Sequence, residues 1–161
     1  MSSHEIGVQL ATRGIAAGIT YLDNEPLGAV RATPLYREEY VFVTPGDCPQ
    51  GIRWADLDDV EICLLSGDMQ NRRILDGVFR DAGAVPRVRL QTNSISALLS
   101  FLRAGWQCVV SRAWLDLYGL PDGRSGAPIE DPTVLHEIGL VIPDAGLVPP
   151  TVRALIESVS D

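Results

Sequence analysis

The stretch from Arg87 to Ser111 constrains the fold of this chain more strongly than any other. Polar and apolar side chains alternate at its start, between Arg87 and Gln91, which is the pattern of a β-strand. Cys108 to Val110 form a short apolar run typical of a buried strand. Between them, apolar residues recur on one face of a helix and a glycine ends the run: Ile95, Leu98, Leu99, Leu102 and Gly105. The stretch therefore predicts two parallel strands joined by a helix.

The segment before Arg87 extends this unit. Glu61–Ser66 has the pattern of a buried strand, and apolar residues between Ile74 and Ala82 mark a helix that ends at Gly83. Residues 61–111 thus predict three parallel strands and two helices, an α/β arrangement. The other predicted elements are a helix end at 4–11, strands at 15–21, 40–43 and 136–142, an irregular stretch at 27–35, a long loop at 118–132 and a last helix after Pro149–Pro150.

Neutral hydrogen-bonding side chains stand where the three predicted strands end. Ser66 ends the first strand, Thr92, Asn93 and Ser94 end the second, and Ser111 ends the third. Because the carboxyl ends of parallel strands meet at one edge of a sheet, we expect these residues to lie together. A helix that starts there presents free backbone N–H groups, which favour a carboxylate or another small anion. Plain helix capping is the alternative for Asn93 or Ser94 taken alone.

Composition limits the class of protein. The 161 residues suffice for one domain or two small lobes, and 21 acidic against 13 basic side chains give a net charge of −8. An acidic chain without a basic cluster is poorly suited to gripping nucleic acid by itself. Three widely spaced cysteines, no signal peptide and no run long enough to span a membrane predict a cytoplasmic protein with no membrane partner.

Signatures of catalysis are thin. The sequence has no HExxH, no glycine-rich phosphate loop, no GxSxG and no metal-ligand spacing, so we expect no enzyme, no cofactor and no metal site. The acid pairs Glu38–Glu39 and Asp58–Asp59 fall on predicted turns, and His136 opens a strand. Arg72–Arg73 at a helix start could hold an anion, with solvated surface charges as the alternative.

An ordered set of short motifs resembles one known family. The motifs are LYREEYVFVTP at 35–45, WADL at 54–57, DAGAVP at 81–86, TNSISALLSFLRAG at 92–105 and IGLVIP at 138–143. In this order they resemble the effector-binding domain of LysR-type transcriptional regulators. The resemblance covers the chain from about Glu5 to Val159.

The resemblance implies two α/β lobes, built like periplasmic binding proteins, that close on a small effector. Lobe one would comprise residues 5–45 and 134–159, and lobe two residues 46–133. Carried over residue by residue, the family's pocket falls on Thr20, Tyr21, Ser66, Gly67, Asp68, Asn93, Ser94, Ile95 and Ser111.

Two departures from the family's pattern bear on these expectations. Trp106-Gln107-Cys108 stands where the family has a glycine-rich turn and a proline, and a bulky Trp106 would alter the pocket. The family's N-terminal winged helix-turn-helix, its linker helix and the first strand and helix of lobe one have no counterpart here. We therefore expect a chain truncated at its N-terminus, whose lobe one is incomplete or completed by a partner.

The sequence thus predicts a regulatory domain that binds a small, anionic metabolite between its lobes and controls transcription through a DNA-binding domain absent here. A homodimer is the expected assembly, because family members pair through these domains. A stand-alone solute-binding module is the alternative, and it would need an export signal that the sequence does not show.

Overall fold

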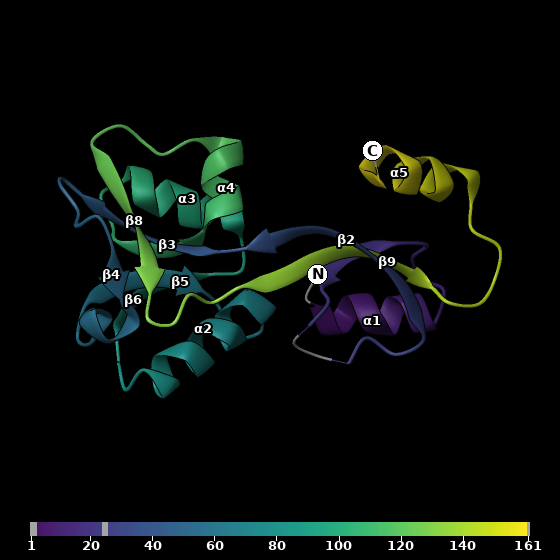
Figure 1. Ribbon diagram of the computed structural model, residues 1–161, viewed down its shortest axis with the longest axis horizontal. Helices are drawn as coiled ribbons and strands as arrows, with labels where there is room; N and C mark the ends of the chain where they lie inside the picture. The colour runs from purple at the N-terminus through teal and green to yellow at the C-terminus, as the bar shows by residue number, and fades with distance from the viewer. Residues whose placement is uncertain (1–2, 24–25, 161) are drawn as a thin grey trace. The chain divides into compact units, whose positions relative to one another are not determined.

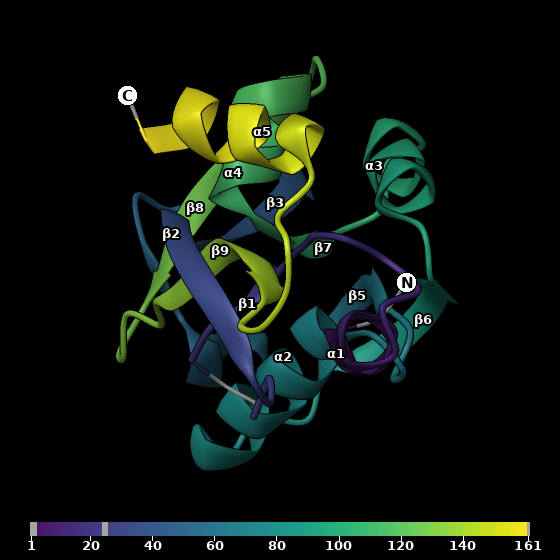
Figure 2. The same ribbon diagram turned by 90° about the vertical axis from the view of Figure 1, so that its right-hand side faces the viewer.

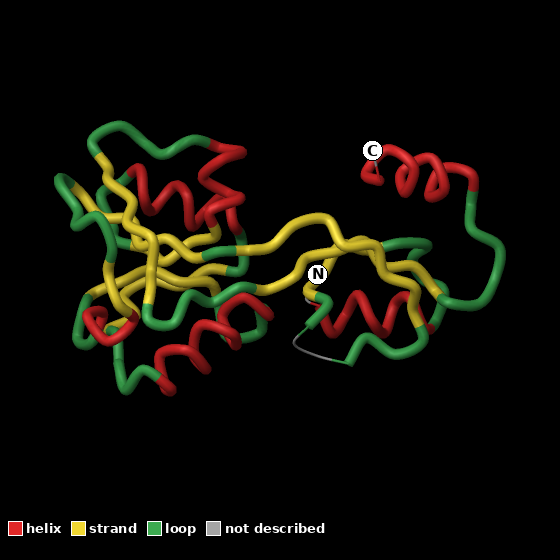
Figure 3. Tube along the Cα trace, viewed as in Figure 1, coloured by secondary structure: helices red, strands yellow, loops and turns green. Residues whose placement is uncertain are grey.

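The predicted alternation of strands and helices over residues 61–111 is confirmed in the computed structural model, which describes residues 3–23 and 26–160. Strand β5 lies parallel to both β6 and β7. Figure 3 shows this alternation along the chain, with helices in red and strands in yellow. The elements are β5 (Glu61–Leu65), α2 (Gln70–Asp81), β6 (Arg87–Thr92), α3 (Ile95–Arg103) and β7 (Cys108–Ser111).

These elements belong to unit 2, residues 38–135, which is one of two compact units of the chain. Its sheet has the strand order β4-β8-β3-β7-β5-β6. Because β3 lies antiparallel to its neighbours β7 and β8, the sheet is mixed. The added elements are β3 (Tyr40–Pro45), β4 (Ile52–Arg53), the 3-10 turn η1 (Trp54–Leu57), α4 (Arg112–Tyr118) and β8 (Arg124–Glu130).

Both faces of this sheet are covered, as expected for strands that are apolar on both sides. Figures 1 and 2 show α3 on one side of β5 and α2 on the other. On the α2 side, Trp54 is fully buried, and its ring meets those of Tyr40 and Phe79 edge-on at centroid distances of 5.9 and 5.4 Å. On the α3 side the core consists of Val41, Val43, Cys63, Leu65, Leu98, Leu99, Leu102, Cys108 and Val110.

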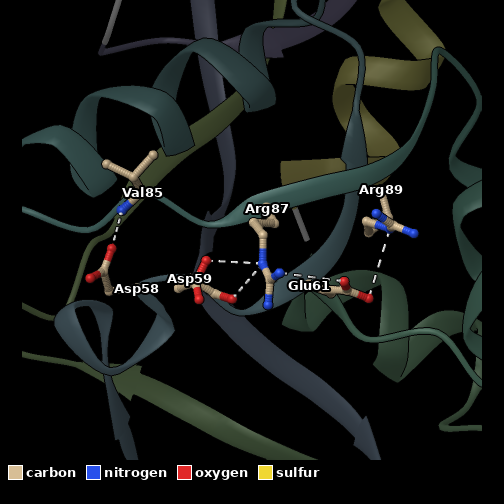
Figure 4. A network of polar contacts seen from close by, with 6 residues as sticks. All are labelled: Asp58, Asp59, Glu61, Val85, Arg87 and Arg89. Carbon is tan, nitrogen blue, oxygen red and sulfur yellow. Dashed lines mark hydrogen bonds and ion pairs between the residues drawn. The ribbon is translucent and has the colours of Figure 1, made fainter.

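Charged residues of β5, of the edge strand β6 and of the turn before β5 gather at the amino ends of these two strands. Arg87 lies between Asp59 and Glu61, at 3.0 and 3.9 Å, and Glu61 also lies 3.8 Å from Arg89 (Figure 4). The Val85 N–H donates to Asp58 over 2.8 Å beside them. Exposed pairs of this kind contribute little stability, but they keep the open edge of β6 charged.

Three segments of the chain differ from their predictions. The loop predicted at 118–132 contains β8, which pairs with β3. The stretch at 27–35, predicted to be irregular, contains most of β2 (Val30–Glu38). Strand β3, expected in lobe one, lies in the sheet of unit 2. The local pattern missed β8 because only its Ala127 and Ile129 are buried, so its strand state depends on a distant partner.

Unit 1 comprises residues 1–37 and 136–161. Its sheet has the order β1-β9-β2, with β1 antiparallel to β9, so β1 is an edge strand within the described part of the chain. Ile6 and Leu10 of α1 pack on Val141 of β9, because they lie four residues apart on one helix face. The remaining bounds are α1 (Ser3–Ala11), β1 (Gly18–Tyr21), β9 (His136–Pro143) and α5 (Pro150–Ser160).

Candidate functional site

The carboxyl ends of three parallel strands meet at one edge of unit 2. Leu65 of β5 pairs with Thr92 of β6, and the Ser66 N–H donates to the Thr92 carbonyl over 2.8 Å. Cys63 pairs with Cys108 in the parallel register of β5 and β7, so Ser66 and Ser111 lie at the same level three residues later. The structure thus brings the predicted strand-end residues of unit 2 to one edge of the sheet.

The start of α3 is built by the predicted TNS segment. Ser94 is the N-cap residue in an extended conformation, and its Oγ accepts a hydrogen bond from the Ala97 N–H at 3.4 Å. The Ser94 N–H in turn donates to Thr92 Oγ1 at 3.1 Å. The capping alternative therefore holds for Ser94. A cap satisfies only part of a helix's first turn of N–H groups, which leaves this end electropositive. Asn93 is exposed, and Ile95 packs against the α3-side core.

The loop after β5 carries a negative charge at the same edge. The Ser66 hydroxyl donates to Asp68 Oδ1 over 2.5 Å. This hydrogen bond, more than any other contact, lowers the pKa of Asp68, so the carboxylate is ionised at neutral pH. Arg73 anchors the loop by donating to the Asp68 carbonyl at 2.7 Å. A ligand at this loop would meet a carboxylate and a hydroxyl together.

Two buried side chains near this edge hold polar atoms without a hydrogen-bond partner in the described part of the chain. Ser111 is fully buried at the end of β7, and its Oγ has no partner. Gln70, the first residue of α2, is 3% exposed, and its Nε2 has no partner although its Oε1 accepts from Arg73. A buried polar atom left unsatisfied costs about 1–3 kcal/mol, and native structures keep few of them.

The sequence pattern did not predict that Gln70 is buried near the strand-end edge. A glutamine at the start of a helix is common, and neither its neighbours nor its spacing mark it as buried. The only available signal was its position one turn after a predicted strand end. Its burial results from the packing of α2 on the sheet, which no local pattern specifies.

The predicted site residues of unit 1 lie at the end of β1. Thr20 is 4% exposed, and its Oγ1 has no hydrogen-bond partner among residues 3–23 and 26–160. Tyr21 is also buried, and its ring meets that of His136 edge-on at 6.1 Å. His136 Nδ1 lies 3.2 Å from Asp23 Oδ1, which gives this histidine a structural role at the start of β9.

The arginine pair at the start of α2 is not a pair of solvated charges. The Arg72 side chain is 15% exposed and lies 2.7 Å from Asp76. Its Nη1 also donates to the Leu65 carbonyl at 3.0 Å and to Gln91 at 3.2 Å. The guanidinium therefore ties α2 to the ends of β5 and β6. This bridge stiffens the strand-end edge.

Trp106 does not stand at the strand-end edge. It precedes β7, at the amino end of that strand, whereas Ser111 ends it. Its backbone N–H donates to the Phe101 carbonyl at 3.0 Å, and the side chain is 37% exposed. The expected effect of Trp106 on the pocket is therefore wrong for the part of the site that unit 2 supplies.

The described residues also bear on metal binding and on membrane insertion. Within the described ranges, no group of three or more His, Cys, Asp or Glu is placed to hold a metal ion. None of the helices in the described residues combines the length and apolarity needed to cross a membrane.

Comparisons with solved structures show the fold. The chain is similar to the regulatory domain of Synechocystis PCC6803 CcmR, solved with 2-PG, at a TM-score of 0.82 and 14% identity over 99% of this chain and 78% of that one. It is similar to the effector-binding domain of QuiR, solved with shikimate, with a TM-score of 0.77 and 18% sequence identity. This match covers 99% of this chain and 77% of that one. It is also similar to the C-terminal domain of a probable LysR family transcriptional regulator from Rhodococcus sp. RHA1, with a TM-score of 0.78 and 24% sequence identity. This match covers 100% of this chain and 82% of that one.

Sequence comparison identifies the family. No curated protein matches the chain. The family model described as the LysR substrate binding domain matches residues 1–161, which is the whole of the chain. The mixed α/β fold of the two units agrees with the regulatory domains above. The chain therefore belongs to the LysR substrate-binding domain family, whose members are domains of transcriptional regulators.

Proposed function

We propose that this chain is the effector-sensing part of a transcriptional regulator and that it binds a small, anionic metabolite. In this proposal units 1 and 2 are the two lobes, and unit 2 contributes the carboxyl ends of β5, β6 and β7. The observation that carries the proposal is a pair of buried donors without partners among the described residues, Ser111 Oγ at the end of β7 and Gln70 Nε2 at the start of α2. A carboxylate would satisfy such donors and would be favoured by the start of α3.

Thr20 and Tyr21 are the residues that unit 1 would contribute to effector binding, as the family resemblance implies. Thr20 Oγ1 is a third buried polar atom without a partner in the described chain, so it too has a hydrogen bond to offer. CcmR and QuiR were solved with 2-PG and shikimate, which supports a small polar effector. The ionised Asp68 favours an effector with hydroxyl or amino donors beside its anionic group.

Effector binding would act on transcription by shifting the balance between conformations of the domain. DNA contact belongs to a winged helix-turn-helix outside this sequence, which fits the net charge of −8. We propose a cytoplasmic homodimer as the working form and no catalytic activity.

The test is a thermal-shift screen against small carboxylates, hydroxy acids and amino acids, with two variants of Ser94. A ligand at a hundred times its Kd adds about 2.7 kcal/mol to the free energy of unfolding, which raises Tm by roughly 5–10 °C. Ser94→Asp keeps a good N-cap but places a carboxylate at the proposed anion site. We expect it to melt like the parent and to bind an anionic hit at least tenfold more weakly.

Ser94→Ala separates capping from binding. It removes the cap without adding charge, so we expect unfolding to become easier by about 1 kcal/mol with a smaller loss of affinity. Full affinity for the anionic hit in Ser94→Asp would exclude the start of α3 as the anion site. A hit that is neutral or cationic would exclude the anionic effector class.

A further inference from the structure

Unit 1 holds two adjoining hollows away from the residues of the proposed effector site. The first, of about 490 Å³, lies between α1 and the segments before β2 and after β9. The second, of about 370 Å³, lies between the end of α1 and the segment that follows β9. They share Arg13, Pro143 and Ala145 in their walls, so Arg13 stands where the two meet.

The walls of the first hollow are mostly apolar, and those of the second combine apolar side chains with polar backbone and the Arg13 guanidinium. Val8, Leu27 and Val30 line the first, and Ile15, Ile142 and Val148 line the second. Sites for small molecules in proteins typically measure about 300–1,000 Å³ and combine apolar walls with few polar groups. Each hollow falls within that range, and so does the pair.

The charges in these walls are of one sign. Arg13 is the one Lys or Arg among the described residues that line the two hollows, and no acidic side chain is among them. This is notable because the chain as a whole has 21 acidic and 13 basic side chains. The local balance is therefore the reverse of the global one, and it selects against cations and for a single anionic group.

Arg13 is placed as a free cation between the hollows. Its backbone N–H donates to the Leu10 carbonyl at 3.1 Å, and its φ of 57° is a conformation that glycine usually adopts after a helix. A methyl group on Gly146 would lie 3.7 Å from Arg13 Nη2, so the guanidinium rests against the loop after β9. It makes no hydrogen bond or ion pair with any residue that the structure describes.

We propose that this pair of hollows, which we name the Arg13 hollow, is a second ligand site that takes a small alkyl or aryl carboxylate. The carboxylate pairs with the Arg13 guanidinium, whose planar donors match two carboxylate oxygens. The apolar part of the ligand lies along the walls formed by α1 and the β9–α5 segment. This site uses no residue of the strand-end edge. The inference therefore does not depend on the proposed effector site, and each can be tested separately.

The first experiment is isothermal titration calorimetry of the full chain with octanoate, octanol and 2-naphthoate. We expect both carboxylates to bind at least tenfold more tightly than the uncharged octanol, because only they can pair with Arg13. Arg13→Asn removes the cation, and asparagine tolerates the left-handed backbone of this position. We expect this variant to lose at least tenfold in octanoate affinity and little in octanol affinity.

The second experiment fills the hollow without touching a charge. Gly7 lies in α1 and lines the first hollow, and a Cβ added there meets nothing within 4 Å. Gly7→Leu improves helix propensity and places its side chain in the hollow, so Tm should not fall while octanoate binding is lost. Gly77→Leu is the matched control, because Gly77 lies in α2 of unit 2 with the same open surroundings.

Ser94→Asp distinguishes this site from the proposed effector site. Octanoate binding that survives Ser94→Asp and is lost in both Arg13→Asn and Gly7→Leu establishes the Arg13 hollow. Binding abolished by Ser94→Asp alone would place octanoate at the strand-end edge and overturn the inference. Absence of octanoate binding at millimolar concentration, or equal affinities for octanoate and octanol, would overturn it as well.

Discussion

Unit 2 contains buried polar atoms that have no hydrogen-bond partner among the described residues. The hydroxyl of Ser111 is fully buried and makes no hydrogen bond within the described residues. Exposed serines of the same unit behave differently, as Ser100 does by donating to the Ser96 carbonyl at 2.9 Å. A buried atom that is unsatisfied in the free protein lowers stability, and it persists where a function needs it.

Ser111→Ala should therefore uncouple stability from binding. We expect the free energy of unfolding to stay unchanged or to rise by up to about 1–2 kcal/mol, because a desolvated hydroxyl is removed. The same variant should bind an effector hit more weakly. Urea unfolding and thermal shift measure the two effects, with Ser100→Ala as the control. A loss of more than about 1 kcal/mol in Ser111→Ala would show that its hydroxyl is satisfied in solution.

Asp68 provides a second test at this scale. Its pKa is lowered chiefly by the Ser66 hydroxyl, so its folded-state pKa lies below its unfolded value. The stability that this shift contributes is present above the unfolded pKa and is lost as pH falls through the folded pKa. Ser66→Ala should raise the pKa of Asp68, and NMR titration of its carboxyl carbon measures the change. An unchanged pKa would show that another contact holds the carboxylate.

Helix α3 is held at both ends by groups outside it. Ser94 caps its start, and the Arg124 guanidinium of β8 donates to the Leu102 and Arg103 carbonyls at its end, at 2.7 and 3.3 Å. These carbonyls belong to the last turn, where orphan acceptors and the helix dipole favour a cation. Strand β8, which the sequence pattern did not predict, thus holds the C-terminal end of α3, the helix that begins at the proposed site.

Arg124→Gln should loosen α3 from its C-terminal end. We expect the free energy of unfolding to fall by about 1–2 kcal/mol, because a charge-assisted hydrogen bond to two carbonyls is lost. Arg103→Gln is the control, since Arg103 also lies in the last turn and is exposed. Hydrogen exchange of the α3 amides should rise in Arg124→Gln alone. Equal effects of the two substitutions would assign the stabilisation to general charge.

At the scale of the molecule, the two units differ in how many segments of the chain form them. Unit 2 is one continuous stretch, residues 38–135, whereas unit 1 is assembled from residues 1–37 and 136–161. The core of unit 2 contains Cys63 and Cys108, both fully buried and directly paired across β5 and β7. Burial raises the pKa of each thiol, so these thiols are unreactive while the core is closed.

Thiol labelling therefore reports the opening of unit 2. In the native chain we expect a disulfide reagent to label Cys48, which is half-buried in a loop, well before Cys63 and Cys108. In denaturant all three cysteines of the sequence should react. An effector at a hundred times its Kd should slow labelling of the two core thiols about a hundredfold and leave Cys48 unaffected. Equal native rates for all three would contradict the closed core.

The sequence alone determined the parts of this protein that depend on neighbouring residues. The three parallel strands and two helices of 61–111 follow from periodicity and from caps such as Ser94, because those signals lie within a few residues of one another. The strand-end residues could be predicted to share an edge, since parallel strands leave no other arrangement. The family also followed from the order of short motifs.

Tertiary structure decided what depends on distant partners. Strand β8 exists because β3 offers it hydrogen bonds, and β3 joins unit 2 because β7 and β8 flank it. The buried Gln70 and the apolar walls around Arg13 likewise require segments that are far apart in the chain to pack together. A local pattern records what a side chain prefers, whereas burial and pairing are set by which surfaces meet, and only the folded chain brings those surfaces together.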